Sequence, residues 1–219
     1  MEIKHAFYIN LNNRLDRRQH VEKEFKEVGI PICRFNAVKL QDGRIGCSLS
    51  HLKCLLLAKE GNWPHVLIVE DDILFLNPDN FRKQLNAFLS SNTKWDVVMF
   101  AGNNIPPYET NGHHSIKISR CQTTTGYMVK RHYYDTLIAN IKEGISRLMK
   151  EPENHYYYAI DKYWFQLQLR DHWYLIVPLS VTQRDDYSDI EQKRTSYSHL
   201  MLDLDKKRLF QQQQQNQPI

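Results

Sequence analysis

The chain has 219 residues, of which 42% are hydrophobic and 25% are charged, and its net charge is +4. These values are ordinary for a globular protein with one full core or two small ones, and the positive charge is too small and scattered to argue for nucleic-acid binding. The four cysteines include no Cys-x-x-Cys pair, so we expect reduced, mostly buried thiols and no zinc site.

The N-terminal segment begins at once with a strand-like stretch over residues 3–11. It lacks the basic start and apolar core of a signal peptide, and no apolar run approaches the roughly 20 residues that span a bilayer. We therefore expect no signal peptide and no membrane span, and a location in the cytoplasm or, in soluble form, in a lumen.

Hydrophobic patterns predict strands that alternate with helices. The expected strands cover residues 6–11, 32–38, 66–69, 95–100, 124–130 and 172–179, the expected helices 16–28, 48–59, 81–90, 132–149 and 160–170, and the longer loops 43–46 and 101–115. This alternation predicts an α/β fold with a mostly parallel central sheet flanked by helices. We expect one domain over residues 1–210 and a disordered, glutamine-rich tail over residues 211–219.

The apolar run at residues 66–69 leads directly into three acids, Glu70, Asp71 and Asp72. Adjacent carboxylates at the end of a buried strand repel one another, so folding alone does not explain them. A divalent cation such as Mn²⁺ or Mg²⁺ would relieve the repulsion, and open α/β sheets bind ligands beyond the carboxyl ends of their strands. The acids therefore predict a metal site and a phosphate-bearing substrate, with a turn or a helix cap as the alternative.

Several short blocks, in the correct order, resemble those of glycosyltransferase family 25. They are Phe7–Leu11 with Arg14, Asp16, Arg17 and Arg18; Phe35–Ala37; Gly46–His51; Leu67–Asp72; Trp95–Val98; Thr125–Val129; Asp161; and the segment from Val177 to Ile190. The resemblance implies a GT-A-like nucleotide-sugar transferase fold and transfer of a hexose, galactose or glucose, from a UDP-sugar. It also implies a hydroxyl acceptor, on a glycan or of hydroxylysine type, and Mn²⁺ dependence in many members.

Within this resemblance, Glu70 and Asp72 form an acid-x-acid variant of the D-x-D signature. We assign Asp72, with Glu70, to the metal that neutralises the diphosphate leaving group, and Asp71 or Glu70 to the ribose or to metal-bound water. Asn10 can read a uracil edge and Arg14 can pair with phosphate; the alternative for both is a helix start with solvated charges.

Ser48, Ser50 and His51 are expected at a helix N-terminus, where backbone N–H groups favour an anion. A serine cap with a packed histidine is the alternative. Gln183 is expected to hold its loop near the UDP-sugar donor.

Direct inverting transfer needs a carboxylate to take the proton of the acceptor hydroxyl. Asp161, among tyrosines and a tryptophan that could stack on sugars, is the first candidate, and Asp186 is its rival. The alternative for Asp161 is a helix start with a packed aromatic face. A retaining mechanism stays open.

Two other functions fit acids placed after a strand. A Mg²⁺-dependent phosphotransfer or phosphohydrolase domain would need an Asp-x-Asp-x-Thr or P-loop pattern, and neither occurs. A catalytically inactive nucleotide-sugar- or glycan-binding module of the same fold is the other alternative, and a short acceptor region at residues 101–119 is compatible with it.

Overall fold

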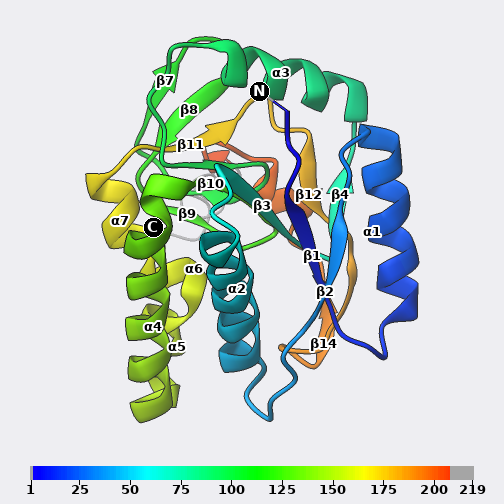
Figure 1. The fold of residues 1–219 in the computed structure, drawn as a ribbon, viewed down its shortest axis with the longest axis vertical. Helices are drawn as coiled ribbons and strands as arrows, with labels where there is room; N and C mark the ends of the chain where they lie inside the picture. The colour runs from blue at the N-terminus through cyan, green and yellow to red at the C-terminus, as the bar shows by residue number, and fades with distance from the viewer. Residues whose placement is uncertain (1, 208–219) are drawn as a thin grey trace, which may run out of the picture.

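The computed structural model describes residues 2–207 and is built around an eight-stranded sheet (Figure 1). The strand order is β2-β1-β3-β10-β5-β11-β8-β7. The strands are β1 (Ala6–Asn10), β2 (Cys33–Asn36), β3 (His65–Glu70), β5 (Val97–Met99), β7 (Tyr108–Asn111), β8 (Ser115–Ile118), β10 (Gly126–Lys130) and β11 (Trp173–Ile176).

The sheet is mixed, although most of its strands run in one direction. β1 is parallel to β2 and β3, and β5 is parallel to β11, whereas β10 is antiparallel to both of its neighbours, β3 and β5. β8 is antiparallel to β11 and β7. Only β10 and β8 of the eight therefore point the other way, and the predicted α/β fold with helices flanking a central sheet is confirmed.

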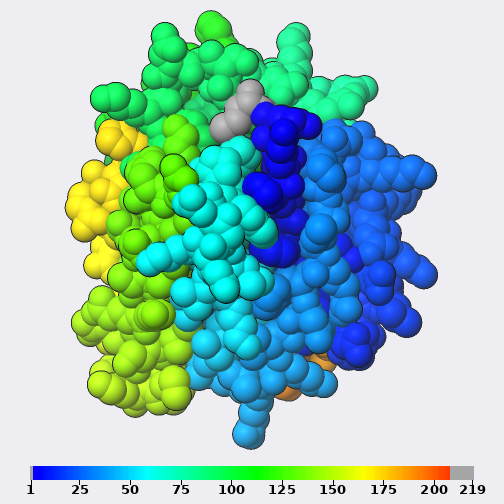
Figure 2. Space-filling view, in the orientation of Figure 1, coloured from blue at the N-terminus to red at the C-terminus, as the bar shows by residue number. Residues whose placement is uncertain are grey.

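Helices cover both faces of the sheet and give it two cores. On one face lie α2 (Gly43–Glu60) and α4 (Tyr134–Lys150), side by side in Figures 1 and 2. On the other lie α1 (Leu15–Val28) and α3 (Pro78–Ser90). Neighbouring strand residues divide between the cores, with Val66 and Ile68 toward α2 and α4 and Leu67 and Val69 toward α1 and α3. This explains why β3 reads as a continuous apolar run.

The remaining elements are short and complete the edges. They are β4 (Ile73–Phe75) with β12 (Val181–Gln183), β6 (Asn103–Asn104) with β9 (Cys121–Gln122), β13 (Asp186–Ser188) with β14 (Lys193–Thr195), the helices α5 (His155–Tyr158), α6 (Ile160–Tyr163), α7 (Phe165–Arg170) and α8 (Ser198–Met201), and the 3₁₀ turns Arg131–Tyr133 and Pro152–Asn154. Two of the expected elements differ from the structure. The expected loop at residues 101–115 contains β6 and β7, and the expected single helix at residues 160–170 is divided into α6 and α7 at the buried Trp164.

Helix α2 begins five residues earlier than predicted. The side chain of Asp42 caps it by accepting hydrogen bonds from the backbone N–H groups of Arg44 and Ile45, at 2.9 and 3.4 Å. The glycines at 43 and 46 therefore lie inside the first turns of a helix and not in a loop. As a result the block over residues 48–51 lies within α2, and the predicted helix N-terminus at Ser48 was wrong.

Gly46 is required for the close approach of α2 to the segment after β2. A Cβ atom at this position would lie 2.6 Å from the carbonyl oxygen of Val38. We expect Gly46→Ala to lower the free energy of unfolding by about 1–3 kcal/mol through overpacking, measured by chemical denaturation. Gly43→Ala is the matched control, because its Cβ would meet mainly the side chain of Ile190, at 3.1 Å. Equal stability of the two variants would contradict this prediction.

All four cysteines are free, with Cys54 and Cys121 buried and Cys33 exposed. Over residues 2–207, no helix combines the length and the apolar character needed to cross a membrane. The predicted disordered tail, residues 211–219, lies outside the described residues.

Candidate active site at the carboxyl ends of the strands

The acidic segment forms a tight turn between β3 and β4. Asp71 and Asp72 are the turn residues, and β4 follows immediately. β12 pairs antiparallel with β4, which opposes Gln183 to Ile73, and the backbone N–H of Arg184 donates to the carbonyl oxygen of Asp72 at 2.8 Å. This pairing brings residues 183–186, more than a hundred positions later in the chain, to the end of β3.

A connected network of ion pairs surrounds this turn. Arg17 donates to Asp71 at 2.9 Å, to Asp72 at 3.2 Å and to Asp186 at 3.2 Å. The network continues through Arg14 and Arg184 and contains three guanidinium groups, of Arg14, Arg17 and Arg184, and five carboxylates, of Asp16, Asp71, Asp72, Asp186 and Asp189. With every group ionised, it carries a surplus of two negative charges.

Asp72 is the member of the network whose charge is least compensated. Its Oδ1 is buried and has no hydrogen-bond partner among the described residues. Burial, and next the negative charge of Glu70, raise the pKa of Asp72 to about 7. A buried carboxylate oxygen without a donor is a suitable ligand for a hard cation, so the predicted role of Asp72 fits its surroundings.

Glu70 is engaged with different partners. Its Oε1 accepts from the hydroxyl of Thr124 at 2.7 Å, and its Oε2 accepts from the amide of Gln183 at 3.4 Å. Cys47 Sγ and His51 Nε2, both from α2, lie 3.5 and 3.6 Å from Oε1. Glu70 therefore accepts hydrogen bonds from the uncharged side chains of Thr124, Gln183 and Cys47, whereas Asp72 is paired with the guanidinium of Arg17.

Asn10 holds Asp71 in place. It is buried, and its amide donates to Asp71 Oδ2 at 2.7 Å, while its carbonyl oxygen accepts from the guanidinium of Arg34 at 2.9 Å. Both ends of the amide are thus occupied by protein groups, which assigns Asn10 to positioning Asp71. Arg14 is similarly occupied, by Asp16, Asp186 and Asp189.

Ser48 and Ser50 have structural partners. Ser48 donates to the carbonyl oxygen of Arg44 at 2.9 Å, and Ser50 donates to that of Gly46 at 2.8 Å. Ser50 also accepts from the backbone N–H of Val38 at 2.9 Å. Both serines are buried, and their hydroxyl groups bond back to the preceding turn of α2. Neither hydroxyl is therefore free to donate to a nucleotide-sugar.

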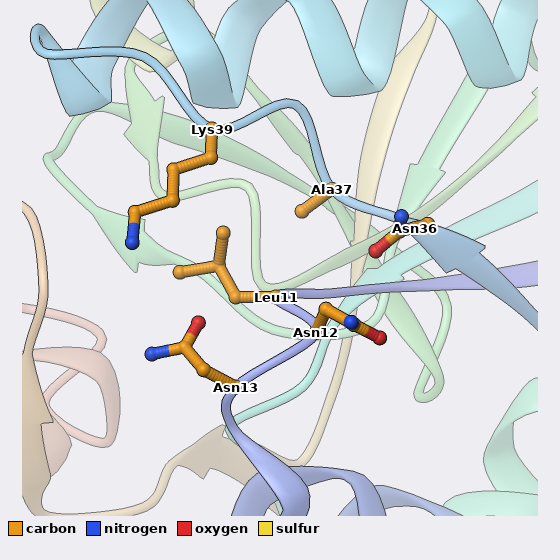
Figure 3. Close-up of a pocket in the computed structure, with 6 residues that line it drawn as sticks. All are labelled: Leu11, Asn12, Asn13, Asn36, Ala37 and Lys39. Atoms are coloured by element: carbon orange, nitrogen blue, oxygen red, sulfur yellow. The ribbon is translucent and has the colours of Figure 1, made fainter.

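A cavity of about 340 Å³ lies where β1 and β2 end (Figure 3). Its polar side chains are mostly amides, and in Figure 3 the side chains of Lys39, Leu11 and Asn13 turn toward the same opening. The lining residues are Leu11, Asn12, Asn13, Asn36, Ala37 and Lys39. None of the acids of the β3–β4 turn lines the cavity; the link between the two is Asn10, which contacts Asp71 and immediately precedes Leu11 in the chain.

The two candidate bases have opposite environments. Asp161 accepts from the backbone N–H of Thr123 at 3.1 Å, and burial raises its pKa. Thr123 has a φ of 78°, a left-handed conformation that β-branched residues rarely adopt. Burial acts to raise the pKa of Asp186 as well, but the N–H of Tyr187 and the charges of Arg184 and Arg17 outweigh it and lower that pKa. A carboxylate beside three guanidiniums is a weak base, so the geometry favours Asp161.

From the sequence, Arg17 was given too little weight, Arg34 and Arg184 were not identified, and the side chains of Cys47 and Thr124 were assigned no role. Arg34 and Arg184 act through contacts between segments far apart in the chain, which no local signal reports. Cys47 and Thr124 stand inside or beside the family blocks, and that position could have drawn attention to them.

Comparison with known proteins supports the resemblance seen in these blocks. The model of glycosyltransferase family 25, described as LPS biosynthesis protein, matches residues 38–133. The predicted resemblance to glycosyltransferase family 25 is confirmed. The matched family 25 segment contains the block at residues 46–51 and the acidic turn, but not Asn10, Asp161 or the β12 strand.

Curated relatives from bacteria and insects carry related names. A putative glycosyltransferase of Haemophilus influenzae is 34% identical over 92 residues, which are 32% of this chain and 33% of the relative. A glycosyltransferase 25 family member of Anopheles gambiae is 24% identical over 198 residues, 74% of this chain and 31% of the relative. The chain thus spans about a third of the length of these two relatives.

Solved structures with a similar arrangement include a glycosyltransferase involved in the glycosylation of the major capsid of PBCV-1. It is 13% identical, and the alignment covers 80% of this chain and 93% of that one, with a TM-score of 0.43. A Drosophila β-1,4-galactosyltransferase 7 mutant, solved with manganese, UDP-Gal and xylobiose, is 11% identical with a TM-score of 0.41, covering 90% of this chain and 73% of that one.

Proposed function

We propose that this protein transfers a hexose, galactose or glucose, from a UDP-sugar to a hydroxyl acceptor on a glycan or on a hydroxylysine-type side chain. The observation that carries the proposal is the placement of the family 25 acids. They form a turn at the carboxyl end of β3, and an amide-lined cavity lies at the carboxyl ends of the parallel strands β1 and β2, on the edge of the sheet where open α/β folds bind nucleotides. A cavity of about 340 Å³ is within the usual size of small-molecule sites.

The electrostatics of the site support a divalent cation, Mn²⁺ or Mg²⁺, as its partner. A diphosphate would approach a network that already has five carboxylates against three guanidiniums. Repulsion would oppose its binding unless a cation stood between them. Asp72, through its unpartnered Oδ1, would hold that cation. When bound, the cation supplies Lewis-acid neutralisation of the charge that grows on the diphosphate.

The chain's own residues would position the donor and move the proton. The amides and Lys39 around the cavity would bind the uridine part, with Arg17 and Asn10 holding Asp71 and Asp72 beside the diphosphate. Asp161 would accept the proton of the acceptor hydroxyl, because burial raises its pKa toward the working range of a general base. In-line attack by that hydroxyl gives inversion.

One observation favours a second function, a nucleotide-sugar- or glycan-binding module without turnover. Arg17 already donates to Asp71 and Asp72, so a guanidinium supplies part of the positive charge that a metal would bring. Such a module would bind UDP and release none from a UDP-sugar.

The experiment is a panel of UDP-sugars, with UDP release measured in Mn²⁺, in Mg²⁺ and after chelation. We expect release from UDP-galactose or UDP-glucose that chelation removes, because Arg17, already paired with Asp71 and Asp72, cannot neutralise the diphosphate by itself. UDP binding measured calorimetrically, without any release, would support the binding module. Absence of both binding and release would overturn the assignment of a nucleotide-sugar site.

A further inference from the structure

Three side chains of different chemistry converge on the α2 side of β3. Cys47 and His51 are four residues apart, on one face of α2, and Glu70 ends β3. Their ligand-type atoms, the cysteine sulfur, a ring nitrogen and a carboxylate oxygen, all lie within 4.8 Å of one another. Sγ is 3.5 Å and Nε2 is 3.6 Å from Glu70 Oε1.

The imidazole of His51 is the unexplained group in this cluster. The side chain has no exposed surface, and Nε2 has no hydrogen-bond partner among the described residues. Its other nitrogen, Nδ1, lies 2.9 Å from the hydroxyl of Tyr127. A buried polar atom without a partner is unfavourable. If Nδ1–H donates to Tyr127, the lone pair of Nε2 points to Glu70 and is free to bind a ligand.

Two of the three separations between the ligand-type atoms match those of a metal centre, and the third, between Cys47 Sγ and His51 Nε2, is within 4.8 Å. Zinc binds sulfur at about 2.3 Å and nitrogen or oxygen at about 2.0–2.2 Å, so tetrahedral ligand atoms lie about 3.3–3.8 Å apart. The separations of 3.5 and 3.6 Å agree with this spacing. We propose that Cys47, His51 and Glu70 bind a divalent cation of the zinc class, with the fourth position open to water or a substrate oxygen.

The ligand types separate this site from the one at Asp72. Thiolate and imidazole favour Zn²⁺ or Co²⁺, whereas an oxygen-only site suits Mn²⁺ and Mg²⁺. Coordination by the Cys47 thiol would release its proton to solvent. The site does not depend on the proposed sugar transfer, but it assigns Glu70 to a cation other than the one at Asp72.

Cobalt substitution tests the site directly. The full chain, treated with chelator and then titrated with Co²⁺, should develop a near-ultraviolet absorption band from thiolate-to-cobalt charge transfer, and equimolar Zn²⁺ should abolish it. Cys47→Ser and His51→Gln should lose the band, while the matched control Cys33→Ser, an exposed cysteine, should keep it. Tyr127→Phe should weaken binding by roughly 10- to 100-fold, as outer-shell changes do.

Several results would overturn the proposal. They are the absence of a band in the parent chain, a band that persists in Cys47→Ser, or a band that Cys33→Ser removes. Circular dichroism checks that each variant folds, and if Cys47→Ser does not, His51→Gln decides. Asp72→Asn should retain the band, so loss of glycosyl transfer and loss of this site are distinguishable.

Discussion

Replacement of Asp72 by asparagine should reduce metal-dependent UDP release by roughly a thousandfold, since the lost neutralisation of the leaving diphosphate is worth several kcal/mol and each 1.4 kcal/mol is tenfold in rate. Asn keeps the size and an oxygen at the position of the unpartnered Oδ1, but it removes the charge that holds a cation. The measurement is UDP release from the active UDP-sugar across a range of Mn²⁺ concentrations. The variant should no longer respond to Mn²⁺.

Asp16→Asn is the matched control for this prediction. Asp16 belongs to the same network through Arg14 and Arg184, but its side chain is 51% exposed and lies outside the β3–β4 turn. It should keep most of the activity, because Arg14 retains Asp186 and Asp189. Full activity of Asp72→Asn with its Mn²⁺ response intact would show that the metal assignment is wrong.

The Asp72→Asn variant should fold as stably as the parent chain, so that a loss of activity reflects the site and not unfolding. Asp72 is a buried carboxylate whose pKa is raised to about 7, chiefly by burial and by Glu70. A neutral amide relieves one of the surplus negative charges of the network, so the melting temperature of Asp72→Asn should equal or exceed that of the parent chain. A lower melting temperature would mean that the bond with Arg17, at 3.2 Å, matters more than the repulsion.

Local sequence patterns were sufficient to predict the strand and the helix that carry the acids and Arg17. The apolar run at residues 66–69 predicts β3 because the strand is buried on both faces, and its end places the acids at the carboxyl edge of the sheet. The first helix was predicted within one residue of its start, and Gly29 ends it with a left-handed φ of 74°. These features depend on neighbouring residues, so the sequence reports them.

Features that depend on distant pairing could not be predicted in the same way. The pairing of β4 with β12 brings Gln183 to Glu70, and the antiparallel β10 brings Thr124 there. The sequence also treats Glu70 and Asp72 as one cluster of acids. In the structure their surroundings differ, with neutral donors around Glu70 and a guanidinium beside Asp72.

The choice of general base is the second prediction with a large effect, and it compares two conservative variants. Asp161→Asn should reduce turnover by about 10²- to 10⁴-fold, the usual contribution of a positioned base, while UDP binding stays unchanged. The amide oxygen can still accept from the N–H of Thr123, so the left-handed turn at Thr123 should survive. UDP release into water, in which water replaces the acceptor, measures the loss without knowledge of the natural acceptor.

Asp186→Asn should behave differently, because its carboxylate is bound by Arg14, Arg17 and Arg184 and its pKa is lowered. Removing that charge leaves Arg14, Arg17 and Arg184 paired with their other carboxylates but weakens their bonds to residue 186. The variant should therefore have a lower melting temperature, with a smaller loss of the maximal rate than in Asp161→Asn. If Asp186→Asn loses the maximal rate and Asp161→Asn keeps it, the base is Asp186. The expected order follows from proton affinity, since a carboxylate stabilised in its charged form by three cations gains little by accepting a proton.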